Sequence, residues 1–223
     1  MEQEEQLEKM YLKGGVVTWD EYYLKICQTV GSNSKCHSRQ IGAILVKDNR
    51  IISTGYNGPP VGVPECRERY KIDKSLLKFL RSKNVSGDEI KRAYNDKVCP
   101  RRPMKFPSGE GLEWCCAIHA EKNCLLSAAL QGISTKGATM YANMDISPCS
   151  QCLGACINAG IKELVLLKNT TYDATVEWVN YFSSIKIREF NLKEDNHFCK
   201  TKNCDDRGDW FCDPSCERFT KNV

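Results

Sequence analysis

The chain has 223 residues, with 32 basic and 28 acidic side chains and a formal net charge of +4. This length suffices for one domain with a sizeable core, and the lack of a long basic run disfavours a nucleic-acid scaffold. No stretch approaches about 18 apolar residues, and the acidic residues 1–5 are unlike a signal peptide. We therefore expect a soluble protein of the cytoplasm, or of the host cytoplasm if the source is viral.

The first third of the chain predicts a helix followed by a hairpin. Thr18 and Glu21 form a capping-box pattern, and apolar residues then recur at helical spacing as far as Val30. Residues 41–47 and 50–56 are typical of two strands, joined by a tight Asp-Asn turn.

Residues 57–117 are the least regular part of the chain, with six prolines and one charged helical stretch at about 74–97. We interpret residues 63–115 as an insertion. Regular patterns return with a helix at about 119–130, stopped by Gly132. The later predicted elements are a strand at 138–144, a helix at 149–159, a strand at 163–167, a helix at 173–182 and a strand at 185–190.

This alternation of strands and helices predicts an α/β sandwich with a mixed central sheet. The predicted domain covers residues 18–190. An acidic extension, residues 1–17, precedes it, and a cysteine-rich tail, residues 191–223, follows it.

Two short clusters carry the chemistry: His-Ala-Glu at residues 119–121 and Pro-Cys-Ser-Gln-Cys at residues 148–152. His119, Cys149 and Cys152 supply three zinc ligands, which leaves the fourth tetrahedral position of the ion for water, as in catalytic sites. A Cys-x-x-Cys pair alone also fits a redox pair or half of a structural zinc site.

The two clusters fit the starts of helices. Cys149 and Cys152, three residues apart, lie on one face of a helix, and the positive helix N-terminus favours thiolates. Residues two apart do not share a helix face, so we place His119 at the first helical residues, before the backbone becomes regular, and Glu121 beyond it.

The joined pattern is identified as the signature of zinc-dependent nucleobase deaminases. The segments at 34–43 (SKCHSRQIGA) and 50–62 (RIISTGYNGPPVG) further resemble deoxycytidylate (dCMP) deaminases, particularly the phage-type enzymes. The resemblance covers about residues 18–190. It implies a cytidine-deaminase-like three-layer α/β/α sandwich, with a five-stranded mixed sheet and the two zinc-binding helices side by side on one face.

The resemblance also implies a reaction. Glu121 takes a proton from zinc-bound water, the hydroxide attacks C4 of cytosine, and the same carboxylate returns protons, so that dCMP gives dUMP and ammonia. The alternative is that Glu121 is an ordinary solvent-facing helix glutamate.

Candidate substrate-binding residues follow from the same resemblance. Asn57 is expected to contact a sugar hydroxyl, although a turn also selects asparagine for its backbone. Lys35 and Arg39 are candidate 5′-phosphate contacts, or else solvated surface cations. The remaining candidates are Ala120, Ser147 and Tyr172.

In the resembled enzymes the glycine-rich loop helps to bind allosteric dCTP or dTTP, with Mg²⁺, in an oligomer that is commonly a hexamer. The candidate residues here are Gly55, Tyr56, Gly58, Pro60 and Gly62. A glycine-rich turn exposes amides that can meet phosphates, but a rigid connector explains the loop almost as well.

The remaining cysteines suggest structural metal. Phage-type relatives carry a second zinc in the region of Cys36, Cys66 and Cys99, with Cys115 or Cys116 completing the set here. In the tail, four thiols are placed to hold a further zinc: Cys199, Cys204, Cys212 and Cys216. Buried free thiols, or a disulfide in the tail, are the alternatives.

Three competing functions remain. The first is deamination of another cytosine nucleotide, such as dCTP or a 5-modified dCMP. The second is a nucleic-acid-editing deaminase, which the scattered charge and the loop at residues 56–59 disfavour. The third is a zinc-binding or interaction module without catalytic activity. The presence of Glu121, the proton-transfer residue of the motif, argues against it.

Overall fold

The computed structural model describes residues 17–106, 110–171 and 174–192. Residues 1–16 of the predicted extension, Tyr172 and the four cysteines of the tail lie outside the described residues.

The centre of the molecule is a five-stranded sheet in the order β2-β1-β3-β4-β5. β1 pairs antiparallel with β2 and with β3, whereas β3, β4 and β5 run parallel. This confirms the predicted five-stranded mixed sheet. The strand bounds are Gly42–Lys47 for β1, Arg50–Tyr56 for β2, Thr139–Ala142 for β3, Glu163–Leu166 for β4 and Lys186–Glu189 for β5.

The turn between β1 and β2 has the chemistry that the sequence predicts. Asp48 and Asn49 have φ angles of 50° and 58°, so both residues are left-handed. Asparagine and aspartate tolerate this conformation, and two left-handed central residues match the twist of a tight hairpin.

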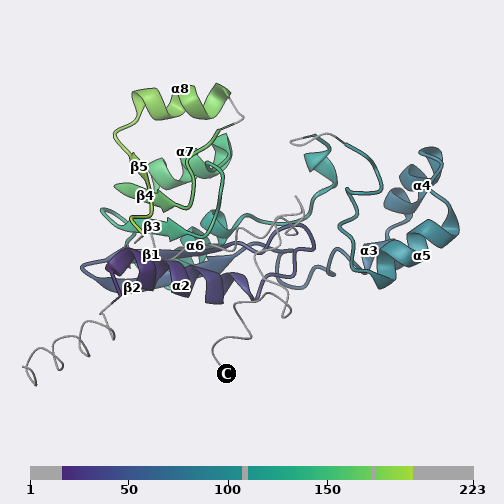
Figure 1. The fold of residues 1–223 in the computed structure, drawn as a ribbon, viewed down its shortest axis with the longest axis horizontal. Coiled ribbons are helices and arrows are strands. Elements are labelled where there is room, and N and C mark those ends of the chain that lie inside the picture. The colour runs from purple at the N-terminus through teal and green to yellow at the C-terminus, as the bar shows by residue number, and fades with distance from the viewer. Residues whose placement is uncertain (1–16, 107–109, 172–173, 193–223) are drawn as a thin grey trace, which may run out of the picture.

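Helices cover both faces of the sheet, which confirms the three-layer sandwich (Figure 1). α2 (Trp19–Gly31) lies on one face, and α6 (Ala120–Leu130), α7 (Ser150–Asn158) and α8 (Ala174–Phe182) lie on the other. Alternate residues of β1 serve the two layers, because successive side chains in a strand point to opposite faces. Ile44 belongs to the core beneath α2, whereas Leu45 belongs to the core beneath α6 and α7. No described helix is long and apolar enough to cross a membrane.

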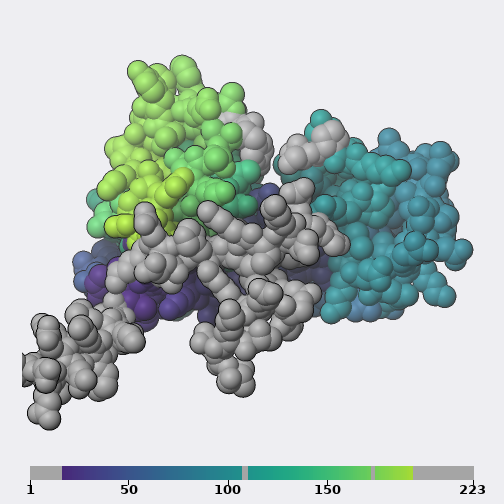
Figure 2. Space-filling view, in the orientation of Figure 1, coloured from purple at the N-terminus to yellow at the C-terminus, as the bar shows by residue number. Residues whose placement is uncertain are grey.

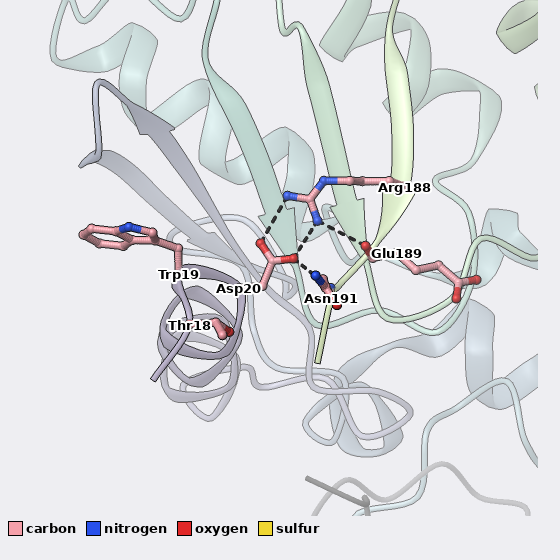
Figure 3. Close-up of a pocket in the computed structure, with 6 residues that line it drawn as sticks. All are labelled: Thr18, Trp19, Asp20, Arg188, Glu189 and Asn191. Atoms are coloured by element: carbon pink, nitrogen blue, oxygen red, sulfur yellow. Dashed lines mark hydrogen bonds and ion pairs between the residues drawn. The ribbon is translucent and has the colours of Figure 1, made fainter. Parts of the chain in front are cut away.

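The end of the sheet that holds β5 is fastened to α2 by a half-buried ion pair (Figure 3). Arg188 of β5 donates from Nη1 and Nη2 to the two carboxylate oxygens of Asp20, at 2.6 and 3.1 Å. Its Nε donates to Glu163 of β4 at 3.1 Å, and the backbone N–H of Asn191 donates to Asp20 at 2.7 Å. The bond to Asp20 raises the pKa of Arg188. These residues line an open pocket at this corner, and the polar groups of Asp20, Arg188 and Asn191 in its wall are hydrogen-bonded to one another.

The segment between β2 and α6 forms a helical lobe beside the sheet (Figures 1 and 2). The lobe contains α3 (Arg69–Ile72), α4 (Lys74–Ser82), α5 (Gly87–Asn95) and the 3₁₀ helix η1 (Leu112–Trp114). It has its own apolar core, built from buried side chains that include Tyr70, Leu76, Leu80, Ile90 and Met104.

The single helical stretch expected at 74–97 is wrong, because the chain turns between two separate helices. Asn84 is left-handed, with φ of 58°, which a continuing helix does not allow. Ser86 then caps α5, with Glu89 completing a capping box. The turn folds α5 back so that Ile90 joins Leu80 in the core of the lobe.

Candidate metal centre and active site

The catalytic helix α6 is pressed against the sheet because β2 carries glycine beneath it. A Cβ at Gly55 would lie 2.2 Å from the backbone nitrogen of Cys124 and 2.8 Å from the carbonyl oxygen of Ala120. Any larger residue would therefore push α6 away. Gly58 then pairs with Ile118 through two backbone hydrogen bonds of 3.1 and 2.8 Å, which fix the chain one residue before His119.

His119 and Glu121 diverge in backbone conformation, as the sequence predicts. His119 is the N-cap of α6, with φ and ψ of −71° and 153°, so it is extended rather than helical. Glu121 lies in the first turn and is 3% exposed. The extended cap allows the imidazole to reach the metal site although its neighbour Glu121 points inward.

The two cysteines lie at the start of α7, which packs beside α6. Cys149 is the N-cap, and its carbonyl oxygen accepts the backbone N–H of Cys152 at 2.9 Å. Nδ1 of His119 lies 3.6 Å from Sγ of Cys149 and 3.3 Å from Sγ of Cys152. Usual zinc bond lengths in a tetrahedron give a nitrogen-to-sulfur edge of about 3.5 Å. The three ligand atoms thus fit one zinc ion.

This is the only group of three or more metal-ligand side chains that converges within 4.8 Å in the part of the chain that the structure describes. Hydrogen bonding to Cys152 lowers the pKa of Cys149 to about 4, and the same contact raises the pKa of Cys152. A hydrogen bond to Cys149 raises the pKa of His119. Burial raises the pKa of Glu121, the buried carboxylate beside the ligands.

Asn57 organises the loop that precedes β1. Its side-chain oxygen accepts from the hydroxyl of Ser34 at 2.7 Å and from the backbone N–H of Ile41 at 2.9 Å. Its amide nitrogen donates to the carbonyl of Arg39 at 2.9 Å. Among the described residues these bonds leave one amide hydrogen for a ligand, so Asn57 supports the backbone whether or not it also contacts substrate.

The other predicted substrate residues each contact a different protein group. Lys35 forms an ion pair of 2.8 Å with Glu65, and Arg39 lies 3.7 Å from Asp145. The hydroxyl of Ser147 donates to the side-chain oxygen of Asn169 at 2.8 Å. Ala120, at the first turn of α6, is fully buried.

The residues proposed for effector binding fall into two groups. Gly55 and Gly58 are buried: Gly55 allows α6 to approach β2, and Gly58 pairs with Ile118. The other three residues are exposed: Tyr56, Pro60 and Gly62. Gly62 has a φ of 81°, which explains glycine there by backbone conformation.

A second group of thiols lies at the base of the lobe. Sγ of Cys66 lies 3.7 Å from Sγ of Cys116, close to the sulfur-to-sulfur edge of about 3.8 Å expected around tetrahedral zinc. Burial raises the pKa of Cys66, and nearby Cys116, Cys36 and Cys99 raise it further. Cys99 in turn interacts with Cys36 and Cys115. The structure thus favours Cys116 over Cys115 as the neighbour of Cys66.

Sequence reasoning missed two asparagines that hold the site together. Asn123, two residues after Glu121, donates to the carbonyl of Tyr56 at 2.7 Å and so ties α6 to the end of β2. Asn143, which is 2% exposed, accepts the backbone N–H of Gly42 at 2.7 Å. The position of Asn143 directly after a buried strand was the available signal.

The chain is similar to known proteins over most of its length. The family model of the cytidine and deoxycytidylate deaminase zinc-binding region matches residues 17–168. The deoxycytidylate deaminases of Enterobacteria phages T2 and T4 are 35% and 34% identical to this chain over 179 residues, covering 78% of this chain and 92% and 89% of theirs. A crystal structure of dCMP deaminase from cyanophage S-TIM5 aligns with 76% of this chain and 95% of its own, at 19% identity and a TM-score of 0.48.

The fold, the ligand set and the buried glutamate define a zinc-dependent deaminase, a hydrolytic enzyme. More particularly, the chain belongs to the cytidine and deoxycytidylate deaminase family.

We expect Glu121→Gln to retain the metal of this site but to lose deamination, because a proton-transfer carboxylate typically contributes about 10² to 10⁴ in rate. Cys149→Ala, which removes a ligand, should lose that metal as well. Elemental analysis and ammonia release from dCMP, measured on both variants, separate the two roles. Glu121→Gln activity within about tenfold of the parent would contradict the assignment.

Proposed function

We propose that the enzyme deaminates dCMP to dUMP and ammonia. The observation that carries this proposal is the convergence of His119, Cys149 and Cys152 beside buried Glu121. The substrate class is supported by the relatives from phages T2, T4 and D29, which are named deoxycytidylate deaminases and match over 92%, 89% and 96% of their length. The cyanophage enzyme was also crystallised with dCMP and dUMP.

His119, Cys149 and Cys152 would hold a zinc ion through one nitrogen and two sulfur atoms. When bound, zinc supplies a Lewis acid that lowers the pKa of a water molecule towards neutrality. Glu121 accepts a proton from the attacking water and delivers protons to N3 of cytosine and to the departing amino group. Its burial keeps bulk water from competing for these transfers, and the packing of α6 on β2 fixes its distance from the ligands.

Asn57 is proposed to present its remaining amide hydrogen to the sugar, and Arg39 to bind the 5′-phosphate. The contact between Arg39 and Asp145 is long, at 3.7 Å, and both side chains are exposed, so a phosphate dianion can displace the carboxylate. Lys35 is the weaker candidate, since it is engaged with Glu65 at 2.8 Å. Ala120, Ser147 and Tyr172 stay proposed as lining residues.

Regulation by dCTP and dTTP, with Mg²⁺, is proposed at the exposed loop that contains Tyr56, Pro60 and Gly62. We also propose that the chain forms a homo-oligomer in the cytoplasm, a hexamer by resemblance. The exposed aromatic side chains of α8 support association, because Trp178, Tyr181 and Phe182 are 67%, 82% and 67% exposed and contact one another.

The domain division is proposed as a deaminase domain, residues 18–190, with the inserted lobe at residues 63–115 and terminal segments 1–17 and 191–223. A structural zinc is proposed at the base of the lobe, with the close pair Cys66 and Cys116 as its first ligands. Cys36 and Cys99 would have to move closer to complete the set, because no three of these four sulfur atoms lie within 4.8 Å of one another. A further zinc is proposed in the tail. Deamination of another cytosine nucleotide, dCTP or a 5-modified dCMP, is the second candidate function, because His119, Cys149, Cys152 and Glu121 act at C4, which all these nucleotides share.

The substrate proposal predicts that kcat/KM for dCMP exceeds that for deoxycytidine by about ten- to a hundredfold, the effect of one charged phosphate contact. Ammonia release from dCMP, dCTP, CMP and deoxycytidine, with and without added dCTP or dTTP, measures this preference. Arg39→Gln should reduce the preference for dCMP. Arg50→Gln should not, because it removes an exposed cation at the start of β2, whereas Asn57 follows the end of that strand. Equal activity on dCMP and deoxycytidine would refute the proposal.

The structural zinc proposal predicts that Cys66→Ser lowers the zinc content by about one ion per chain. Cys27→Ala is the matched control, because Cys27 is also buried but belongs to α2, far from the lobe in sequence, and its thiol hydrogen-bonds to the carbonyl of Tyr141. Truncation after Leu192 should remove the separate tail ion. Zinc per chain is measured by elemental analysis, and full zinc content in Cys66→Ser would show that these thiols are not ligands.

A further inference from the structure

The positive charge of the chain is concentrated in the inserted lobe. Residues 63–106 contain 13 basic and six acidic residues, a net charge of +7, whereas the whole chain carries +4. The rest of the molecule is therefore net negative, at −3. The expectation of scattered charge is therefore wrong, because the excess lies in one continuous segment, which folds into the lobe (Figure 2).

The outward face of α4 is the most one-sided part of the lobe. Lys74, Lys78 and Arg81 recur at helical spacing and are exposed, while Leu76 and Leu80 on the opposite face are fully buried. Ser75 and Ser82 flank the three cations and are also exposed. α4 contains no acidic residue. The three cations extend over about 10 Å of the helix, given a rise of about 1.5 Å per residue.

This arrangement does not serve the stability of the helix. Like charges three or four residues apart repel, and Lys74 is the first residue of α4, where the helix dipole disfavours a cation. None of the three cations forms an ion pair with any residue that the structure describes. The core of the lobe is apolar and does not need them. The three cations are therefore available to an external anion.

The arrangement of the cations on α4 favours some anionic partners over others. A helix that binds a membrane surface inserts an apolar face, but the apolar face of α4 is already buried in the lobe. On the neighbouring helix α5, Lys91 and Arg92 are preceded by the exposed acidic residues Asp88 and Glu89, so α5 does not add a second acid-free row of cations beside that of α4. A single row matches one phosphodiester backbone better than the two backbones of a duplex.

We propose that the face of α4 formed by Lys74, Lys78 and Arg81 binds the phosphodiester backbone of single-stranded nucleic acid. This binding is independent of deamination and does not place a base in the zinc site. It holds the enzyme near a polynucleotide, while free nucleotides remain its substrates. The contact is sequence-independent, because cations on a helix face read phosphates and not base edges.

Fluorescence anisotropy with a labelled oligodeoxythymidine, over a range of NaCl concentrations, tests this proposal on the full chain. The triple variant Lys74→Gln/Lys78→Gln/Arg81→Gln should bind at least about tenfold more weakly near 100 mM NaCl. Its plot of log affinity against log salt should be shallower by about 2, since each phosphate contact in a single strand contributes about 0.7. Glutamine preserves helix propensity, so the lobe should stay folded.

The matched control is Arg50→Gln/Lys136→Gln/Lys162→Gln, which removes the same charge from exposed residues at the edge of the sheet that includes the β1–β2 turn. This variant should keep nearly full affinity and slope. Both triple variants should deaminate dCMP at the parental rate, which confirms folding and separates this test from that of the proposed function.

Three results would overturn the proposal: no binding by the parent at low salt, equal losses in the two triple variants, or binding to a duplex of the same length that is as tight as to the single strand. Binding to phosphatidylserine vesicles that is lost together with α4 charge, without binding to the oligonucleotide, would assign the surface to a membrane instead.

Discussion

The close approach of α6 to β2 is the constraint on which the site depends. Gly55 removes the Cβ that would otherwise lie 2.2 Å from the backbone of α6, and Asn123 ties the same helix to the carbonyl of Tyr56. With α6 held in place, its N-cap residue His119 lies beside Cys149 and Cys152 at the start of α7. Glu121, in the first turn of α6, is buried. A shift of α6 by the width of one methyl group would alter the distances from His119 and Glu121 to both cysteines.

Much of this architecture could be predicted from residues that act locally. The capping box at Thr18, the left-handed Asp48-Asn49 turn and the extended cap at His119 are each set by a few neighbouring residues, and the structure has all three. The expected strand at 138–144 is shorter in the structure, because pairing with β4 ends at Ala142.

Features that depend on tertiary contacts could not be predicted in the same way. The hydrogen bond between Arg188 and Asp20 joins residues that are 168 positions apart, and the sequence around each residue does not indicate its partner. The break between α4 and α5 has a local cause at Asn84, but charged residues on both sides concealed it. The three cations of α4 are close together in the sequence with no acidic residue between them, but the burial of Leu76 and Leu80 on the opposite face depends on the packing of the lobe.

The central claim is that turnover requires a metal held by His119, Cys149 and Cys152. Its most direct test is to deplete the full chain of metal with a chelator and to measure ammonia release from dCMP while zinc is added back. The account predicts no turnover by the depleted protein, and activity that rises with zinc until the catalytic site is filled. Full activity in protein shown by elemental analysis to contain no metal would contradict it.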